Sequence, residues 1–221
     1  MRGHGNRITI GVLLGLCLLF AGAVRAEGDA KDQAKDQAKD QVKDPVAQEA
    51  EIREQLKKTP DDPEVLFRLG NALYDQGRRT EAKDTFLKVL DKKPDYVKAL
   101  VNLGVVLNED GQSEEALKYF DKAEALAPTD VTVLCNKGQA LYALKQYEGA
   151  IDLYKKSTDL EPKNALPRYL LGIAFADAGI YREAIREWRQ VVAIDPTTEA
   201  AKTAAENIKV LEELLPPDKK E

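Results

Sequence analysis

The chain has 221 residues, of which 43% are hydrophobic and 32% are charged, and its net charge at pH 7 is −5. Only 14 glycines and 10 prolines occur, which excludes a collagen-like or low-complexity polymer and fits a folded chain with many surface charges. The acidic balance, without a large basic patch, also argues against a nucleic-acid-binding protein.

Residues 1–26 have the organisation of an export signal, so we set them aside from the fold. Two arginines and no acidic residue precede an apolar run from Ile8 to Val24, and this run ends in Val24-Arg25-Ala26, where small residues stand at the positions that signal peptidase recognises. We expect cleavage after Ala26. The alternative is an uncleaved N-terminal membrane anchor, for which the run is at the short limit of a membrane span. The expected location is therefore the periplasm or another part of the cell envelope, with inner-membrane anchoring as the alternative.

A charged segment of low complexity follows over residues 27–45. The tetrapeptide Lys-Asp-Gln-Ala occurs twice in succession, and Lys-Asp-Gln-Val and Lys-Asp-Pro come after it. A period of four places the apolar residues near one face of a helix, but isolated helices of this length are only marginally stable in water. We therefore predict a solvated spacer of mixed coil and helix.

A repeat of 34 residues organises the chain from residue 63 onward. In each unit a glycine is followed 12 residues later by an alanine and after 12 more by a proline, with no insertion between units. The recurring residues are Gly70, Gly104, Gly138 and Gly172, then Ala82, Ala116, Ala150 and Ala184, and finally Pro94, Pro128, Pro162 and Pro196. So many matches in one register do not arise by chance. They predict units at residues 63–96, 97–130, 131–164 and 165–198.

This pattern resembles the tetratricopeptide repeat. The first unit carries the family pattern as Leu66, Leu69-Gly70, Leu73, Ala82, Phe86 and Pro94, and the aromatic position recurs as Phe120, Tyr154 and Trp188. The resemblance covers residues 63–196. Its departures are the family's tryptophan position, held by Leu66, Leu100, Leu134 and Arg168, and Lys137 in place of a leucine. The resemblance implies an all-α fold, a right-handed α-solenoid of four helix-turn-helix repeats with N-terminal and C-terminal capping helices.

Local signals divide each unit into two antiparallel helices. Residues suited to helix capping stand just before three predicted helix starts, namely Asp62, Asp130 and Asn164. The prolines end the second helix, because the residue before a proline avoids helical dihedral angles. Glycine holds the turn between the two helices in three units, and Lys145 holds it in the third unit. We expect the repeated glycine and alanine where the helices cross, and the aromatic rings between neighbouring units.

Helices are also predicted on both sides of the four units. Residues 46–59 are expected to form an N-capping helix, with Ile52 and Leu56 turned inward. Residues 198–215 are expected to form an amphipathic C-terminal capping helix. Its apolar stripe is Ala201, Ala204, Ala205, Ile208 and Leu211. Caps with a polar outer face keep the ends of a repeat array soluble, and residues 216–221 are left as a short tail.

The sequence lacks the residues that catalysis or metal binding would need. Signal cleavage would remove His4, the only histidine, and Cys17, which leaves Cys135 as a lone thiol. This excludes histidine-based triads, dyads and metal ligands, and neither glycine-rich phosphate-binding motif occurs. We therefore predict a protein that is not an enzyme and that carries no metal and no cofactor. Cys135 is expected to be a core residue, with redox coupling to a partner as the alternative.

The resemblance also implies a binding surface. In this family the first helices of successive units line a concave groove, and the polar and aromatic side chains that point into it are the candidate peptide-binding residues. These are Arg68, Asn71, Tyr74, Asn102, Asn108, Asn136, Gln139 and Tyr142. Because an amide carries both a donor and an acceptor, a row of amides can hydrogen-bond the backbone of an extended peptide. The alternative is that these residues are merely exposed and polar.

Two hypotheses of function follow. The first is a periplasmic or envelope adaptor that binds a peptide or a partner protein in the groove. The second is a membrane-tethered structural scaffold or assembly factor, in which residues 8–24 stay as an anchor. The carboxylate clamp of chaperone-binding family members is not expected, because Phe67, Thr132 and Asn136 stand where that clamp needs cations.

Overall fold

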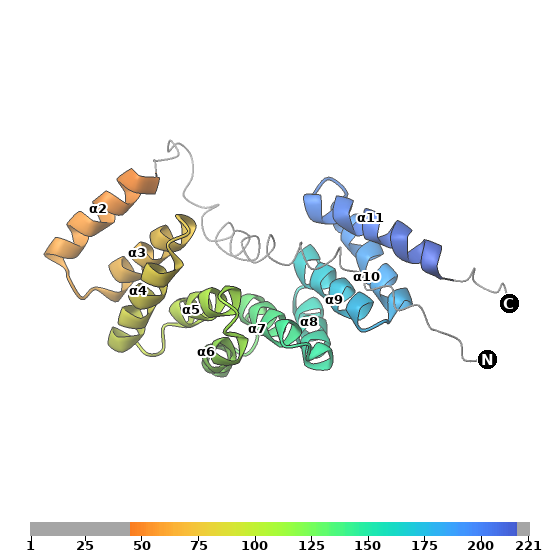
Figure 1. The fold of residues 1–221 in the computed structure, drawn as a ribbon, viewed down its shortest axis with the longest axis horizontal. Helices are drawn as coiled ribbons and strands as arrows, with labels where there is room; N and C mark the ends of the chain where they lie inside the picture. The colour runs from red at the N-terminus through yellow and green to blue at the C-terminus, as the bar shows by residue number, and fades with distance from the viewer. Residues whose placement is uncertain (1–44, 216–221) are drawn as a thin grey trace, which may run out of the picture. The chain divides into compact units, whose positions relative to one another are not determined.

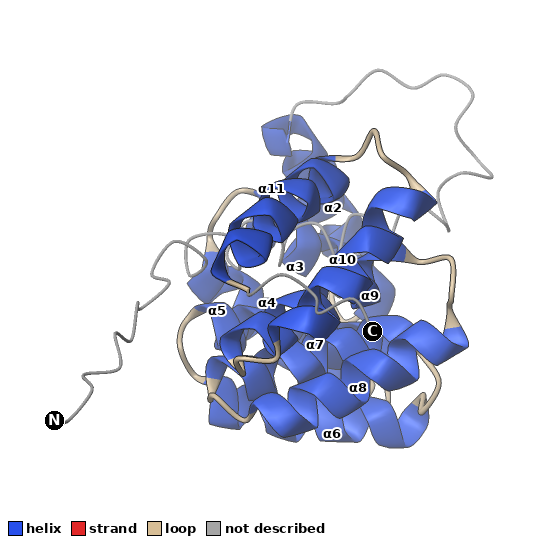
Figure 2. Ribbon diagram, turned by 90° about the vertical axis from the view of Figure 1, so that its right-hand side faces the viewer, coloured by secondary structure: helices blue, strands red, loops and turns tan. Residues whose placement is uncertain are grey.

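The computed structural model describes residues 45–215, and in this range every regular element is a helix (Figure 2). The predicted signal peptide, the spacer up to residue 44 and the C-terminal tail lie outside the described residues. Within residues 45–215, none of the helices combines the length and the apolar character that crossing a bilayer requires.

Four helix pairs follow one another along the chain, with one further helix before them and one after them (Figure 1). The pairs are α3 (Pro63–Asp75) with α4 (Arg79–Lys92), α5 (Val97–Glu109) with α6 (Ser113–Leu126), α7 (Val131–Ala143) with α8 (Tyr147–Leu160), and α9 (Ala165–Asp177) with α10 (Tyr181–Ile194). The flanking helices are α2 (Pro45–Lys58) and α11 (Glu199–Leu214). Each second helix also packs against the first helix of the next unit. This arrangement confirms the predicted all-α solenoid.

The predicted caps begin three of the four first helices. The side chains of Asp62, Asp130 and Asn164 accept hydrogen bonds from backbone N–H groups two or three residues later, at 2.8–3.3 Å. These N–H groups have no partner inside the helix, so each cap satisfies donors that the helix leaves open. At the start of α5 the same place holds Tyr96, whose side chain makes no such bond.

The turn inside each unit needs a left-handed backbone conformation. The glycines of three turns have φ between +75° and +79°, and Lys145 has φ +60° at the same place in the third unit. Glycine adopts this conformation freely, whereas a side chain makes it unfavourable. The third unit therefore folds into the same turn at a cost that the other units do not bear.

The repeated glycine marks the place where the two helices of a unit cross. A Cβ atom added at Gly70 would lie 2.5 Å from the ring of Phe86, and one added at Gly104 would lie 2.6 Å from the ring of Phe120. Gly172 faces the indole of Trp188 in the same way. Our expectation placed the aromatic rings between units, and the structure adds a contact that it did not include. Each ring covers the glycine of its own unit, where only the absent side chain leaves room for it.

The two ends of the solenoid bury fewer side chains than its middle. In α2 only Glu49 and Ile52 are buried, and in α11 the buried residues are Ala201, Ala204 and Leu211. Glu206 of α11 stands 34 residues after Gly172 and is exposed. A glutamate there cannot accept an aromatic ring from a following helix, so the repeat pattern ends at α11.

Candidate functional site

The eight candidate residues lie on the first helices of three successive units. Helix α3 carries Arg68, Asn71 and Tyr74. Helix α5 carries Asn102 and Asn108, and α7 carries Asn136, Gln139 and Tyr142. Most of these side chains are partly buried, Arg68 is exposed, and Asn136 is buried. They therefore form a continuous series along α3, α5 and α7, and hydrogen bonds fix several of them.

One hydrogen bond joins the amides of two neighbouring units. The Nδ2 of Asn102 donates to the Oδ1 of Asn71 at 2.8 Å. This bond sets the direction of both amides, because it uses one donor of Asn102 and one acceptor lone pair of Asn71. The Oδ1 of Asn102 and the Nδ2 of Asn71 remain as the groups that each amide can offer to a ligand.

Two further amides are held by neighbours on the chain. The hydroxyl of Ser113 donates to the Oδ1 of Asn108 at 2.7 Å, which leaves the Nδ2 of Asn108 as a donor. The Nδ2 of Asn136 donates to the backbone carbonyl of Thr132 at 2.8 Å, which leaves the Oδ1 of Asn136 as an acceptor. Donor and acceptor ends are thus specified at each of these positions.

Gln139 differs from the other amides. Its Nε2 is buried, yet it has no hydrogen-bond acceptor among the described residues. A buried donor without an acceptor destabilises a protein by about 1–3 kcal/mol, so such groups usually have a partner. The amide of Gln139 is therefore a donor to which a bound carbonyl group would add a missing hydrogen bond.

Arg68 and the two tyrosines contact side chains of other helices. Arg68 donates from Nη1 to the Oε1 of Gln55 on α2 at 2.8 Å. The hydroxyl of Tyr74 donates to Glu109 of the next unit at 2.5 Å. The hydroxyl of Tyr142 donates to Asp177, which stands at the same position of its unit as Glu109 does. The same bond between units thus occurs at two junctions of the solenoid.

The fourth unit continues the series with apolar residues. On α9 the corresponding positions hold Leu170, Ile173 and Ala176, and all three are buried. The polar series therefore ends at α7, because the corresponding side chains of α9 are apolar and buried.

Comparison with known proteins identifies the repeat. Two family models match the chain, one described as tetratricopeptide repeat over residues 49–131 and one described as TPR repeat over residues 138–179. The chain belongs to the tetratricopeptide-repeat family. No curated protein sequence matches it.

Solved structures with the same fold include several tetratricopeptide-repeat (TPR) proteins. The thermophilic TPR protein TTC0263 of Thermus thermophilus has a TM-score of 0.66 and 18% identity, covering 87% of this chain and 97% of that one. MamA of Desulfovibrio magneticus RS-1, from residue 41 to its end, has a TM-score of 0.64 and 23% identity, covering 81% and 97%. YrrB, described as a TPR protein with an unusual peptide-binding site, has a TM-score of 0.60 and 20% identity, covering 86% and 90%. At these identities the likeness shows the fold.

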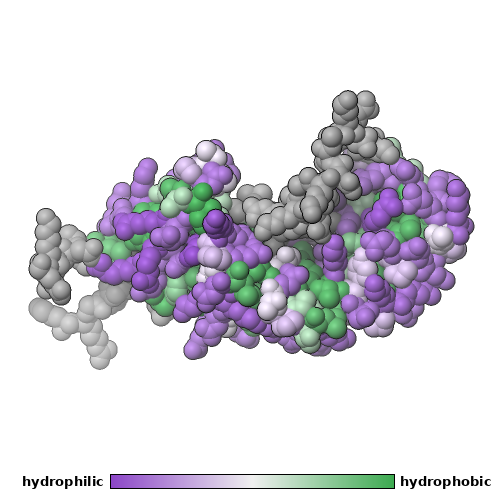
Figure 3. Space-filling view, turned by 180° about the vertical axis from the view of Figure 1, so that it is seen from behind, coloured by the Kyte–Doolittle hydropathy of each residue, from purple (hydrophilic) through white to green (hydrophobic). Residues whose placement is uncertain are grey.

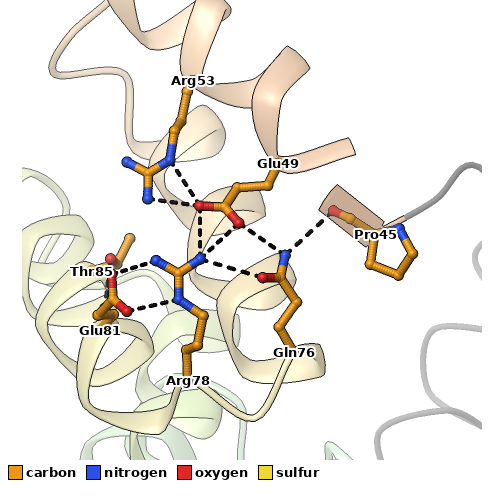
Figure 4. A network of polar contacts seen from close by, with 7 residues as sticks. All are labelled: Pro45, Glu49, Arg53, Gln76, Arg78, Glu81 and Thr85. Atoms are coloured by element: carbon orange, nitrogen blue, oxygen red, sulfur yellow. Dashed lines mark hydrogen bonds and ion pairs between the residues drawn. The ribbon is translucent and has the colours of Figure 1, made fainter. Parts of the chain in front are cut away.

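A charged network that we did not predict joins α2 to the first TPR unit (Figure 4). The carboxylate of Glu49, which is 8% exposed, accepts hydrogen bonds from Arg53, Gln76 and Arg78 at 2.8–3.0 Å. Burial alone would raise the pKa of Glu49, but these bonds outweigh it and hold that pKa below its ordinary value. Arg78 also pairs with Glu81 at 2.6 Å. In the sequence, the one signal for this network is Arg78, an arginine in the turn of the first unit.

The departures from the TPR pattern also have local partners. Lys137, which replaces a leucine, pairs with Asp121 at 2.7 Å and with Glu124 at 2.8 Å. Arg168, at the family's tryptophan position, pairs with Glu187 at 3.0 Å. Cys135 is fully buried, and burial raises the pKa of its thiol to about 12. A thiol that stays protonated behaves as a small core residue. Residues 45–215 contain no cluster of potential metal ligands.

Proposed function

We propose that this protein is a non-enzymatic adaptor that binds an extended segment of a partner protein along the first helices of its TPR units. The observation that carries the proposal is the buried Nε2 of Gln139, which lacks an acceptor among the described residues. A backbone carbonyl of a bound peptide would supply that acceptor and relieve the cost of the unmatched donor.

The neighbouring amides support a backbone ligand in particular. Asn71 and Asn108 offer donors, and Asn102 and Asn136 offer acceptors, because their other ends are already bonded. An extended peptide presents N–H and C=O groups along its length, so it can satisfy both kinds of group in one series. YrrB, whose solved structure has the same fold, is described as having a peptide-binding site. We extend peptide binding to this chain on these grounds.

Selection from a random peptide library, followed by titration of labelled peptides, tests the proposal. The full chain should select peptides, and Gln139→Leu should weaken their binding about threefold to tenfold, the value of one neutral hydrogen bond. Asn102→Ala/Asn136→Ala should weaken it further. As a matched control, Gln190→Ala alters an exposed amide on α10, outside the candidate surface, and should bind as the parent does. Equal binding by all variants would show that the peptide does not bind along the first helices.

We also propose that the protein is exported and acts in the periplasm or at the cell envelope. The proposal rests on residues 1–26, where basic residues, an apolar run and small residues follow in the order of a signal peptide. N-terminal sequencing of the protein from its native envelope should give a chain that begins at Glu27. A chain that keeps residues 8–24 would favour the alternative, a membrane-tethered scaffold or assembly factor.

A further inference from the structure

The repeat allows the same three positions to be compared at each junction between units. At the first junction these positions hold Tyr74 and Arg79 of the first unit and Glu109 of the second. The carboxylate of Glu109 accepts a hydrogen bond from Tyr74 at 2.5 Å and pairs with the guanidinium of Arg79 at 3.1 Å. Its side chain is only 9% exposed. The chain thus supplies both a hydroxyl donor and a cation to this shielded carboxylate.

The second junction carries no charge at these positions. They hold Asn108 and Ser113 of the second unit and Ala143 of the third. Asn108 and Ser113 bond to each other at 2.7 Å, and the alanine presents nothing to a cation. These three positions therefore carry no charge at the second junction.

The third junction keeps the acid and the tyrosine but lacks the cation. The positions hold Tyr142 and Tyr147 of the third unit and Asp177 of the fourth. Tyr142 donates to Asp177 as Tyr74 donates to Glu109, but Tyr147 stands where the first junction has its arginine. The two tyrosine rings lie 5.5 Å apart between centroids and are inclined by 56°. Among the described residues, Asp177 forms no salt bridge, and it remains partly exposed.

We propose that the corner formed by Tyr142, Tyr147 and Asp177 binds a cationic side chain, arginine or lysine, of the partner segment. A carboxylate beside two aromatic rings attracts a cation through its charge and through the ring faces. Arginine should bind better than lysine, because a guanidinium stacks on a ring while it pairs with a carboxylate. Arg79 at the first junction is an example of the group that this position accepts.

The corner is continuous with the surface proposed for peptide binding. Gln139 and Tyr142 are three residues apart on α7 and therefore lie on the same face of that helix. A segment whose carbonyl group meets Gln139 would thus bring a nearby side chain to the corner. The inference rests on the proposed function. It adds the binding of a cationic side chain to a surface that is otherwise proposed to bind the backbone of the peptide.

Blocked single amino acids test the corner separately from the peptide. We would titrate the 15N-labelled full chain with N-acetylarginine methylamide and with its neutral isostere N-acetylcitrulline methylamide. The arginine probe should cause saturable shifts at residues 142–147 and around Asp177, and the citrulline probe should not. Asp177→Asn should weaken arginine binding about tenfold, with an unchanged melting temperature as evidence of folding. Equal shifts from both probes, or full binding by Asp177→Asn, would overturn the proposal.

Exchanging residues between junctions provides a second test. Tyr147→Arg gives the third junction the cation of the first. The new arginine should pair with Asp177, so the corner should no longer bind the arginine probe. Arg79→Tyr does the reverse, and it should create a second arginine site at Tyr74 and Glu109. If neither exchange moves the binding, the comparison between junctions is wrong. Library peptides that depend on Gln139 but carry no cation would still support the proposed function, so the two proposals can fail independently.

Discussion

Single residues in the turns affect the stability of each unit. Lys145 holds a left-handed turn in which three other units have glycine. Lys145→Gly should stabilise the protein by about 1 kcal/mol, because glycine adopts this conformation without the clash of a side chain. Urea denaturation measures the change. Gly111→Ala is the matched control, because a Cβ atom at Gly111 would meet no other atom within 4 Å. We expect this variant to lose a similar amount of unfolding free energy, and the loss would come from the backbone conformation alone. An unchanged midpoint for Lys145→Gly would show that the turn is not strained.

Trp188 is the largest buried side chain of the solenoid. Its ring is fully buried over Gly172, and its Nε1 donates to the backbone carbonyl of Tyr169 at 3.2 Å. Trp188→Ala should therefore cost about 3–5 kcal/mol of unfolding free energy and should loosen α11, which packs on the same helix. Denaturant titration measures this cost. A loss below about 1 kcal/mol would mean that the cavity collapses or that the ring is not part of the core.

Residue patterns also show what the sequence could and could not predict. The glycine-to-aromatic contact is a steric requirement within one unit, so it leaves a fixed spacing that is visible in the chain. The capping residues are equally local. The burial of Glu49 was not predicted, because it depends on Arg78, 29 residues away, in a turn whose other units have no arginine. The directions of the amides were also beyond prediction, because each depends on the geometry of one hydrogen bond.

Among the helices, α2 combines a small apolar contact with a charged network. It buries Ile52 and Glu49. Hydrogen bonds from Arg53, Gln76 and Arg78 hold the pKa of Glu49 below its ordinary value, and Glu81 pairs with the guanidinium of Arg78. A lowered folded pKa means that the unfolded chain binds the proton more readily, so the contribution to stability is complete above roughly pH 4.3, the ordinary value. It is lost as the pH falls through the lower pKa of the folded protein.

We therefore expect α2 to detach before the TPR units when the solution is acidified. Amide hydrogen exchange, expressed as protection factors, should show α2 losing protection as the pH falls below about 4.3, while α5 keeps it. In Glu49→Gln the protection of α2 should be low already at neutral pH and should change little with acid. Equal loss of protection in α2 and α5 would contradict a charge-dependent contact.

We predict that the third unit is the weakest of the four TPR units. It combines the strained turn at Lys145 with Ser157, whose buried hydroxyl bonds to the carbonyl of Leu153 where two other units have valine. The ion pairs of Lys137 offset the third departure that the sequence suggested. We expect amides of residues 131–162 to exchange faster than those of residues 97–128. Equal protection in the two ranges would show that all three departures are compensated.

Over residues 45–215, the solenoid exposes the side chains of successive helices and contains no cluster of potential metal ligands. One face of it is mostly hydrophilic, with apolar side chains in separate patches (Figure 3). The repeat and the all-α fold were predictable because a 34-residue period fixes which side chains recur at equivalent positions, whereas the binding role of the candidate residues stays a prediction. The corner at Asp177 was not, because it becomes apparent only when equivalent contacts at the three junctions are compared. For the partner we propose a chemical class, an extended backbone with a cationic side chain.

A crystal structure of the full chain with a peptide selected by it would test the proposed binding mode most directly. We predict that the peptide lies extended along α3, α5 and α7, that one of its backbone carbonyl oxygens accepts a hydrogen bond from the Nε2 of Gln139, and that a cationic side chain sits between Tyr147 and Asp177. A peptide bound on the second helices, or one that leaves Gln139 without an acceptor, would contradict the proposed binding mode.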